Sequence, residues 1–168
     1  MSGRISLINK YSLVCGAIGA ASYLFTIIAC DSPIEFLHQL KKSEILPPIW
    51  LLILISCFAC FLAGIAAGAV VDATVQKLNT GGYERSAYRG GLFFLSALYA
   101  FLAWYPVFFG GEHLFISLII VGLCIAFSLL CVVNWFNCYP AFASIIMILF
   151  SSWTIYIFIS NVIIFFSN

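Results

Sequence analysis

Charged side chains divide the chain into five long, uncharged and strongly apolar segments, which cover residues 11–30, 46–71, 90–109, 114–133 and 141–166. A helix needs about 20 apolar residues to cross the hydrocarbon core of a bilayer, and each segment meets this length. Every backbone polar group in lipid must be paired, and these stretches are too long and too continuously apolar for barrel strands. The pattern therefore predicts an all-α membrane protein, a bundle of five transmembrane helices.

The links between the segments predict how the helices are connected. Two links, 111–113 and 134–140, are so short that the helices they join must be antiparallel neighbours. The link 72–89 is polar and contains the turn signal Asn79-Thr80-Gly81-Gly82. The link 31–45 is the longest polar stretch on the other side, and we expect it to be partly structured. No second domain or repeat is evident, so the whole chain, 1–168, is expected to form a single transmembrane domain.

Particular residues mark how the helices begin and pack. The second helix is expected to begin near Pro47-Pro48, because proline is tolerated in a first helical turn. The same helix carries Gly64-x-x-x-Gly68, a stripe of small residues that lets another helix approach closely. The sequence leaves open whether this stripe packs within the chain or forms a dimer interface.

Composition and charge exclude several classes of function. Only 8% of the residues are charged, against about 25% in a soluble domain. The net charge is +1, and no basic stretch is long enough to follow a phosphate backbone, which excludes nucleic-acid binding. No charge lies inside the five apolar segments. Ion pumps and proton relays carry such charges, so their absence argues against ion-coupled transport and against acid–base catalysis within the bilayer.

The basic residues also predict an orientation. The side with the N-terminus holds five of them, whereas the other side holds only Lys41 and Lys42. The five are Arg4, Lys10, Lys77, Arg85 and Arg89. Because basic residues concentrate in cytoplasmic links, the N-terminus is predicted to be cytoplasmic if the protein sits in a plasma or inner membrane. An odd number of spans then places the C-terminus outside.

The first apolar segment admits a second interpretation. It ends in Ile27-Ile28-Ala29-Cys30, which is similar to a lipoprotein cleavage box, so the segment also fits a signal peptide followed by a lipidated Cys30. The five-helix prediction takes this segment as an uncleaved first helix.

Cysteine and histidine give no firm sign of metal or redox chemistry. Cys57-x-x-Cys60 has redox or metal-binding spacing, but it lies in the middle of an apolar segment without an acid, a base or a second pair nearby. Cysteine in that setting behaves as a small apolar residue. The two histidines, His38 and His113, both lie in links, where each fits either an axial haem ligand or a solvated side chain.

Aromatic side chains are numerous, with 17 Phe, 8 Tyr and 4 Trp. Trp50, Trp104 and Trp153 fall inside or at the ends of apolar segments. Such residues often form the belt at the headgroup level of a membrane. They also suit a cavity for a flat apolar ligand, so both interpretations stay open at this point.

Three blocks of sequence carry a more specific pattern. Residues 36–50 follow W-Y-x-x-L-x-K-P-x-W-x-P-P-x-W, with matches at Leu40, Lys42, Pro47, Pro48 and Trp50. Residues 101–110 follow N-x-x-W-x-P-[VI]-F-F-G, with matches at Trp104 and throughout 106–110. Residues 149–161 follow P-Y-x-x-W-x-x-x-A-x-x-L-N and keep Trp153 and Asn161. In order and spacing, these blocks resemble the tryptophan-rich sensory protein/translocator protein (TspO/MBR) family.

The chain departs from the family pattern at several positions. Phe36, Ile45 and Ser56 stand where many members have tryptophan. Phe101 replaces an asparagine, and the acidic residue often found in the fourth helix is missing near Ile120. The chain therefore resembles a divergent member with an altered pocket.

The resemblance implies a five-helix bundle that often forms a homodimer and binds porphyrins, haem-like tetrapyrroles or sterol-like ligands. The link 31–45 would cover the ligand cavity as a lid. Mapped onto this sequence, the ligand-binding candidates are Trp50, Trp104, Pro106, Trp153, Asn161, Phe36 and Ser56. No catalytic residue, metal site or required cofactor is expected; porphyrin or haem would be a ligand, bound for transport, sensing or regulation.

Two alternatives remain at this stage. Some bacterial members of the family are associated with light-dependent porphyrin breakdown, in which pocket tryptophans take part. Trp153 is kept here, but Ser56 replaces its partner. The other alternative is a structural or partner-binding membrane protein whose pocket has closed, with Phe101 and Ile155 filling it.

Overall fold

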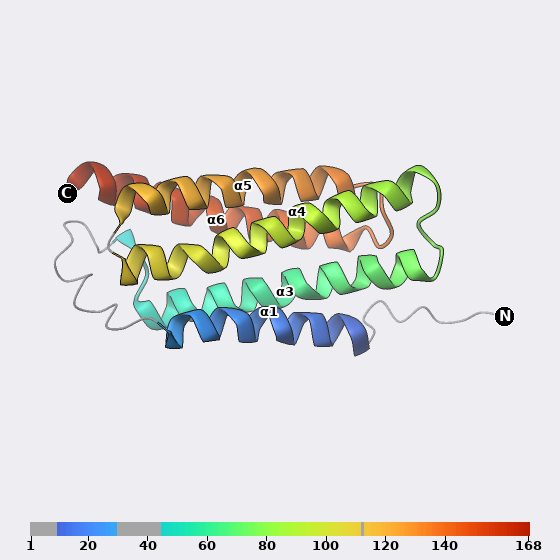
Figure 1. Cartoon of the computed structure of the whole chain (residues 1–168), viewed down its shortest axis with the longest axis horizontal. Helices are drawn as coiled ribbons and strands as arrows, with labels where there is room; N and C mark the ends of the chain where they lie inside the picture. The colour runs from blue at the N-terminus through green and yellow to red at the C-terminus, as the bar shows by residue number, and fades with distance from the viewer. Residues whose placement is uncertain (1–9, 30–44, 112) are drawn as a thin grey trace.

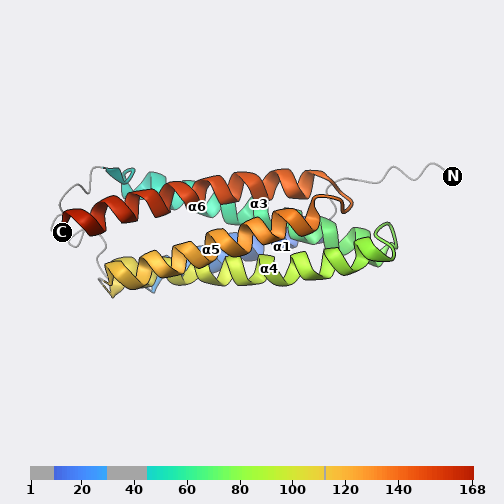
Figure 2. The same cartoon turned by 90° about the horizontal axis from the view of Figure 1, so that it is seen from above.

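The computed structural model describes residues 10–29, 45–111 and 113–168. Its five long helices lie side by side in an elongated bundle (Figures 1 and 2). They are α1 (Lys10–Ile28), α3 (Ile49–Val75), α4 (Gly82–Tyr105), α5 (Leu114–Trp135) and α6 (Phe142–Ser167). All five are long and apolar enough to cross a membrane, which confirms the predicted fold class. The predictions for Phe36, Cys30 and His38 fall outside the described residues.

Two helices extend into the link 72–89, beyond their predicted bounds of 46–71 and 90–109. α3 continues to Val75 and α4 already begins at Gly82, so the turn is confined to residues 76–81. The Gln76 side chain donates a hydrogen bond to Asp72 one helical turn earlier (2.7 Å). Polar side chains at a helix end can reach the headgroup layer while the backbone hydrogen bonds continue, so the charge pattern marks the membrane boundary and not the helix end.

Prolines set two helix boundaries. α3 begins at Ile49 and not at 46, because a residue that precedes proline is driven out of the helical region and Pro48 occupies the N-cap. Near the end of α4, Pro106 has no N–H to donate to the preceding turn. The chain continues there as a π-helix, η2 (Pro106–Gly110), and the Gly111 N–H bonds to the Pro106 carbonyl (2.9 Å).

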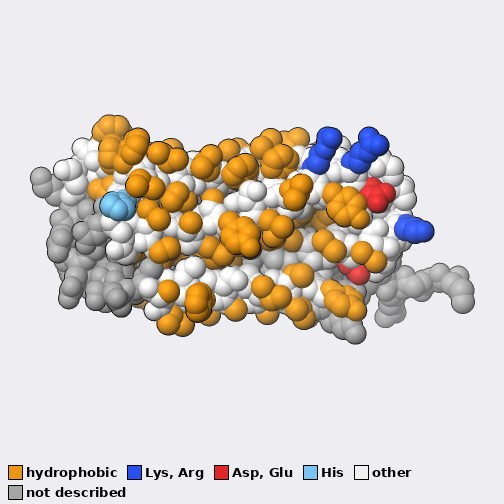
Figure 3. Space-filling view, viewed as in Figure 1, with side chains coloured by type: hydrophobic (Ala, Val, Ile, Leu, Met, Phe, Trp, Pro, Cys, Tyr) orange, Lys and Arg blue, Asp and Glu red, His pale blue; other side chains and the backbone are white. Residues whose placement is uncertain are grey.

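The helix order matches the antiparallel arrangement expected from the short links. α4 packs along α5 and α5 along α6, while α3 packs against both α1 and α6. α1 begins at one end of the bundle, and the last residue of α6 lies at the other end (Figure 1). Apolar side chains cover the middle of the face seen in Figure 3, and the coloured charged side chains gather toward one end. The molecule therefore has the surface of a membrane-spanning bundle.

The Gly64-x-x-x-Gly68 stripe packs within the chain. A methyl group at Gly64 would lie 2.5 Å from the Cys15 carbonyl oxygen, and one at Gly68 would lie 2.7 Å from the Cα of Ser12. From the α1 side, a methyl group at Gly16 would lie 2.9 Å from the Phe61 carbonyl oxygen, and one at Gly19 would lie 2.8 Å from the Cys60 carbonyl oxygen. The stripe therefore joins α1 to α3 by close backbone contact and is not available as the dimer interface considered above.

The turn between α3 and α4 is held against the link between α5 and α6. The buried Asn79 side chain donates to the Tyr139 carbonyl oxygen (2.8 Å) and accepts from the Tyr139 N–H (2.7 Å). In the same link, burial raises the pKa of the Cys138 thiol above its usual range, so the thiol stays protonated near neutral pH. This end of the bundle is thus tied together by side-chain bonds between two turns.

Candidate functional site

An aromatic cluster surrounds Trp104 in the half of the core toward the η2 end of α4. Phe101, Trp104, Tyr105 and Phe108 recur at helical spacing and so share one face of α4 and η2. The ring of Phe101 lies 6.2 Å from Trp104, and the ring of Phe108 lies 5.7 Å from it, measured between centroids. All four side chains are buried. Sequence reasoning singled out Phe101 and Trp104 and missed the other two, because both faces of a helix in lipid are apolar and periodicity alone does not mark the buried one.

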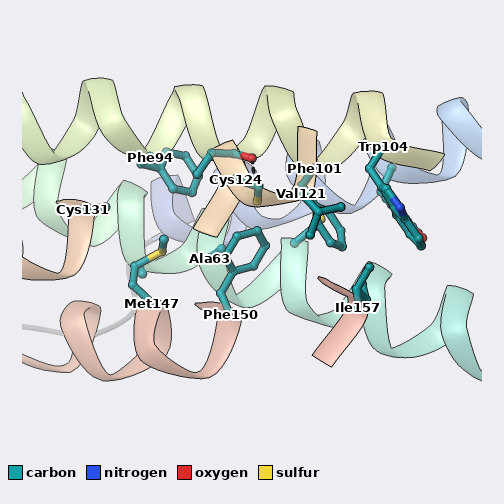
Figure 4. Close-up of a cluster of buried hydrophobic side chains, with 14 of the residues drawn as sticks. Ala63, Phe94, Phe101, Trp104, Val121, Cys124, Cys131, Met147, Phe150 and Ile157 are labelled. Carbon is teal, nitrogen blue, oxygen red and sulfur yellow. Dashed lines mark hydrogen bonds between the residues drawn. The ribbon is translucent and has the colours of Figure 1, made fainter. Parts of the chain in front are cut away.

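Two further helices add aromatic side chains to this cluster. Tyr23 from α1 stacks on Phe101 at 5.6 Å, and Phe150 from α6 meets Phe101 edge-on at 5.3 Å. Figure 4 shows Phe101, Phe150 and Trp104 within the same buried layer. Phe101 therefore occupies the middle of the cluster. Ile155 does not contribute, because it is 39% exposed on the outer side of α6.

Several buried polar groups near this cluster have no hydrogen-bond partner. They include the Trp104 indole N–H and the Asn161 side-chain amide, whose oxygen and nitrogen are both unpaired. Both residues are essentially inaccessible to solvent. Leaving a buried donor or acceptor unsatisfied costs about 1–3 kcal/mol per group, so such groups in a native protein require an explanation.

These unpaired groups belong to the same end of the core. Trp104 projects from α4 and Ile157 from α6 into the same region (Figure 4). Asn161 follows Ile157 by four residues and is buried on the same face of α6. The Tyr23 hydroxyl lies beside Ser56 but outside hydrogen-bonding geometry with it. The region between α1, α3, α4 and α6 thus combines aromatic faces with polar atoms that no protein group satisfies.

Trp153 connects the core to the start of α3. Its indole N–H donates to the Ser56 hydroxyl (3.0 Å), and its ring stacks on Tyr156 at 5.3 Å. The Tyr156 hydroxyl in turn donates to the carbonyl oxygen of Ile45 (2.8 Å), the last residue of the segment expected to act as a lid. Ser56, which stands at a family tryptophan position, therefore serves here as the acceptor for the retained Trp153.

The remaining predicted site residues are placed differently. Pro106 is half-buried and begins η2, where it shapes the backbone. Trp50 lies in the first turn of α3 with 66% of its surface exposed, on the outside of the bundle. The structure therefore brings Trp104, Trp153, Asn161 and Ser56 into or beside the core, and it leaves Trp50 apart from them.

Within the described part of the chain, no group of three or more His, Cys, Asp or Glu side chains is placed to hold a metal ion. Cys57 and Cys60 carry free thiols on the α1-facing side of α3, and the Cys57 sulfur lies 4.0 Å from the Ala20 carbonyl oxygen. His113 is exposed just before α5. The Cys-x-x-Cys pair therefore packs as small apolar side chains.

Comparison with known proteins agrees with this arrangement. The sequence model of the TspO/MBR family matches residues 11–166, which include nearly all of the five helices. No curated protein and no solved structure matched the chain significantly. The family is one of five-helix bundles, and the five apolar helices make this chain an integral, multi-pass membrane protein with a buried aromatic cluster that fits ligand binding. The chain therefore belongs to the TspO/MBR family.

Proposed function

We propose that this protein binds a large, flat, apolar ligand of the tetrapyrrole or sterol class between α1, α3, α4 and α6, and acts in its transport, sensing or regulation. One observation carries the proposal: the Trp104 indole and the Asn161 amide are buried beside an aromatic cluster without partners. A ligand with polar groups at its edge would satisfy them. Family membership supports the same class of ligand.

The chemistry of these residues suits such a ligand. Aromatic rings stack favourably on a flat ring system, and Trp104 and Tyr23 offer large ring faces. The Trp104 N–H donates a hydrogen bond, and the Asn161 amide both donates and accepts. In a site surrounded by apolar helices, these few polar groups would fix the orientation of the ligand. Porphyrin or haem would be a bound ligand here and not a required cofactor.

Phe101 favours a second candidate, a closed core in a structural or partner-binding protein. Its ring is buried and contacts Tyr23, Trp104 and Phe150. A ligand can enter this layer only if Phe101 moves. In the proposed function, binding displaces this ring; in the closed-core alternative, the ring stays in place and only a smaller side chain at 101 admits a ligand.

Titration of the detergent-solubilised protein with protoporphyrin IX, followed by porphyrin absorbance, tests the proposal. We expect saturable binding at low micromolar concentration. Trp104→Phe and Asn161→Leu should each weaken binding about tenfold, the loss expected for one buried hydrogen bond. The control is Trp135→Phe, because Trp135 donates to the Ala87 carbonyl at the opposite end of α5.

The outcomes separate the two candidates. Equal affinity in wild type, Trp104→Phe and Asn161→Leu would refute the proposed site. Binding by Phe101→Ala together with none by wild type would establish the closed core. A sterol that competes with protoporphyrin would assign both ligand classes to one site, whereas a sterol that binds without competing would restrict the site to tetrapyrroles.

A further inference from the structure

A group of basic side chains lies at the end of the bundle where α3 turns into α4. Lys77, Arg85 and Arg89, here called the basic patch, are all exposed. Figure 3 shows the Lys and Arg side chains of this face gathered at that end, next to the apolar middle of the bundle. Lys10 begins α1 at the same end. The patch therefore lies at the border between the membrane-facing surface and water.

The nearby acids do not neutralise the two arginines. Asp72 on α3 accepts a hydrogen bond from Gln76. Glu84 is adjacent to Arg85 in sequence, which places it about 100° around the helix from that residue. Within the described part of the chain, neither arginine forms an ion pair with an acid. Both guanidinium groups are therefore free to bind an anion from outside the protein.

The spacing of Arg85 and Arg89 suits a phosphate group. The residues lie four apart on α4, so their side chains leave the same face one turn apart. Two like charges at this spacing repel each other, and an anion between them removes the repulsion. Guanidinium groups bind phosphate oxygens through paired N–H bonds, and this geometry is specific to arginine.

An apolar stripe runs along α4 beside Arg85, toward the middle of the bundle. Tyr88, Leu92, Leu95 and Tyr99 are all exposed, and they recur at helical spacing toward the middle of the bundle. A ligand on this surface meets cationic groups at the water side and apolar side chains on the lipid side. A phospholipid has this distribution, with a phosphate at one end and acyl chains at the other. A free phosphate would make no contact with the apolar stripe.

We infer that Arg85 and Arg89 bind the phosphate of an anionic phospholipid whose acyl chains lie along the Tyr88–Tyr99 face of α4. Lys77 adds positive charge and favours lipids with a net negative headgroup over zwitterionic ones. The inference is independent of the proposed ligand site, which lies in the core and not on this surface.

Native mass spectrometry of the full chain in neutral detergent, with added phosphatidylglycerol or phosphatidylcholine, tests the inference. We expect tighter binding of phosphatidylglycerol. Arg85→Gln and Arg89→Gln should each reduce its affinity about fivefold, and the double variant should reduce it about 25-fold. Leu92→Ser should also weaken binding without changing any charge.

Glu84→Gln is the matched control, because it changes an exposed charge in the same region and should strengthen binding. All these positions are exposed, so unchanged thermal unfolding will verify that the variants fold. Equal affinity for the two lipids, or unchanged phosphatidylglycerol binding in the double variant, would overturn the inference. Displacement of the lipid by millimolar inorganic phosphate would identify a general anion site and would likewise overturn it.

Discussion

At the scale of single residues, two buried asparagines differ in whether their side-chain amides are hydrogen-bonded. Asn79 is fully engaged with the backbone of Tyr139, on both its N–H and its carbonyl. Asn161 is equally buried but has no partner for either amide atom. The unpaired amide of Asn161 is the kind of polar group that the proposed ligand site requires.

The substitution of each asparagine by leucine should therefore have opposite effects. Asn161→Leu should raise the free energy of unfolding of the ligand-free protein by about 1–2 kcal/mol, because two unpaired polar atoms are removed at similar volume. Asn79→Leu should lower it by about 2–3 kcal/mol, since the backbone groups of Tyr139 lose their partners. Thermal unfolding in detergent, followed by circular dichroism, measures both. A lower melting temperature for Asn161→Leu would contradict the absence of a partner.

Two adjacent glycines make a second residue-scale comparison. A methyl group at Gly90 would overlap the indole of Trp135, whose N–H donates to the Ala87 carbonyl (3.1 Å). A methyl group at Gly91 would meet nothing within 4 Å. The close approach of α4 to α5 thus depends on Gly90 and not on Gly91.

Gly90→Ala should lower the free energy of unfolding by about 1–3 kcal/mol, because the indole must move and its hydrogen bond is strained. Gly91→Ala should leave it unchanged or raise it by up to about 1 kcal/mol through the better helix propensity of alanine. Melting curves of the two variants under identical conditions are the measurement. Equal destabilisation of both would show that the helix, and not the contact with Trp135, is the sensitive element.

At the scale of elements, the glycine stripe of α3 determines how α1 is held. α1 depends on α3 for most of its packing, and the two backbones meet at glycines on both sides. Helices in a bilayer gain little from burying apolar surface against each other, so close backbone packing is their main source of affinity. The stripe is therefore a structural feature of the monomer.

Gly64→Ala should destabilise the protein by about 1–3 kcal/mol, since the added methyl group meets the Cys15 carbonyl. Its oligomeric mass, measured by size-exclusion chromatography with light scattering, should not change. Gly122→Ala is the control, because a methyl group there lies 3.7 Å from the Phe158 ring, an ordinary contact. A shift of Gly64→Ala from dimer to monomer would instead assign the stripe to an intermolecular interface.

At the scale of the whole molecule, the bundle has two unlike ends. One end carries the α3–α4 turn with the basic patch, and the other carries the α4–α5 link and the end of α6. In a plasma or inner membrane, the excess of lysine and arginine at the first end predicts that this end is cytoplasmic. An odd number of spans would then place the two chain termini on opposite sides of the membrane.

Reporter fusions test this orientation. In a bacterial inner membrane, a fluorescent protein that folds only in the cytoplasm should be active when fused to the N-terminus and inactive when fused to the C-terminus. Replacement of Lys77, Arg85 and Arg89 by glutamine should reduce the difference in fluorescence between the two fusions. The reason is that three of the basic residues that determine the orientation are removed. Activity at the C-terminus of the wild-type chain would reverse the predicted orientation.

The sequence by itself determined the number of spans, their antiparallel order and the family. These depend on the lengths of uncharged segments and links and on the spacing of Trp and Pro residues, all of which are local. Only the tertiary structure decided which aromatic residues face the core. In lipid both faces of a helix are apolar, so periodicity does not separate the buried Trp104 from the exposed Trp50. The bond between Trp153 and Ser56 and the isolation of Asn161 likewise depend on contacts between distant segments, which no local pattern encodes.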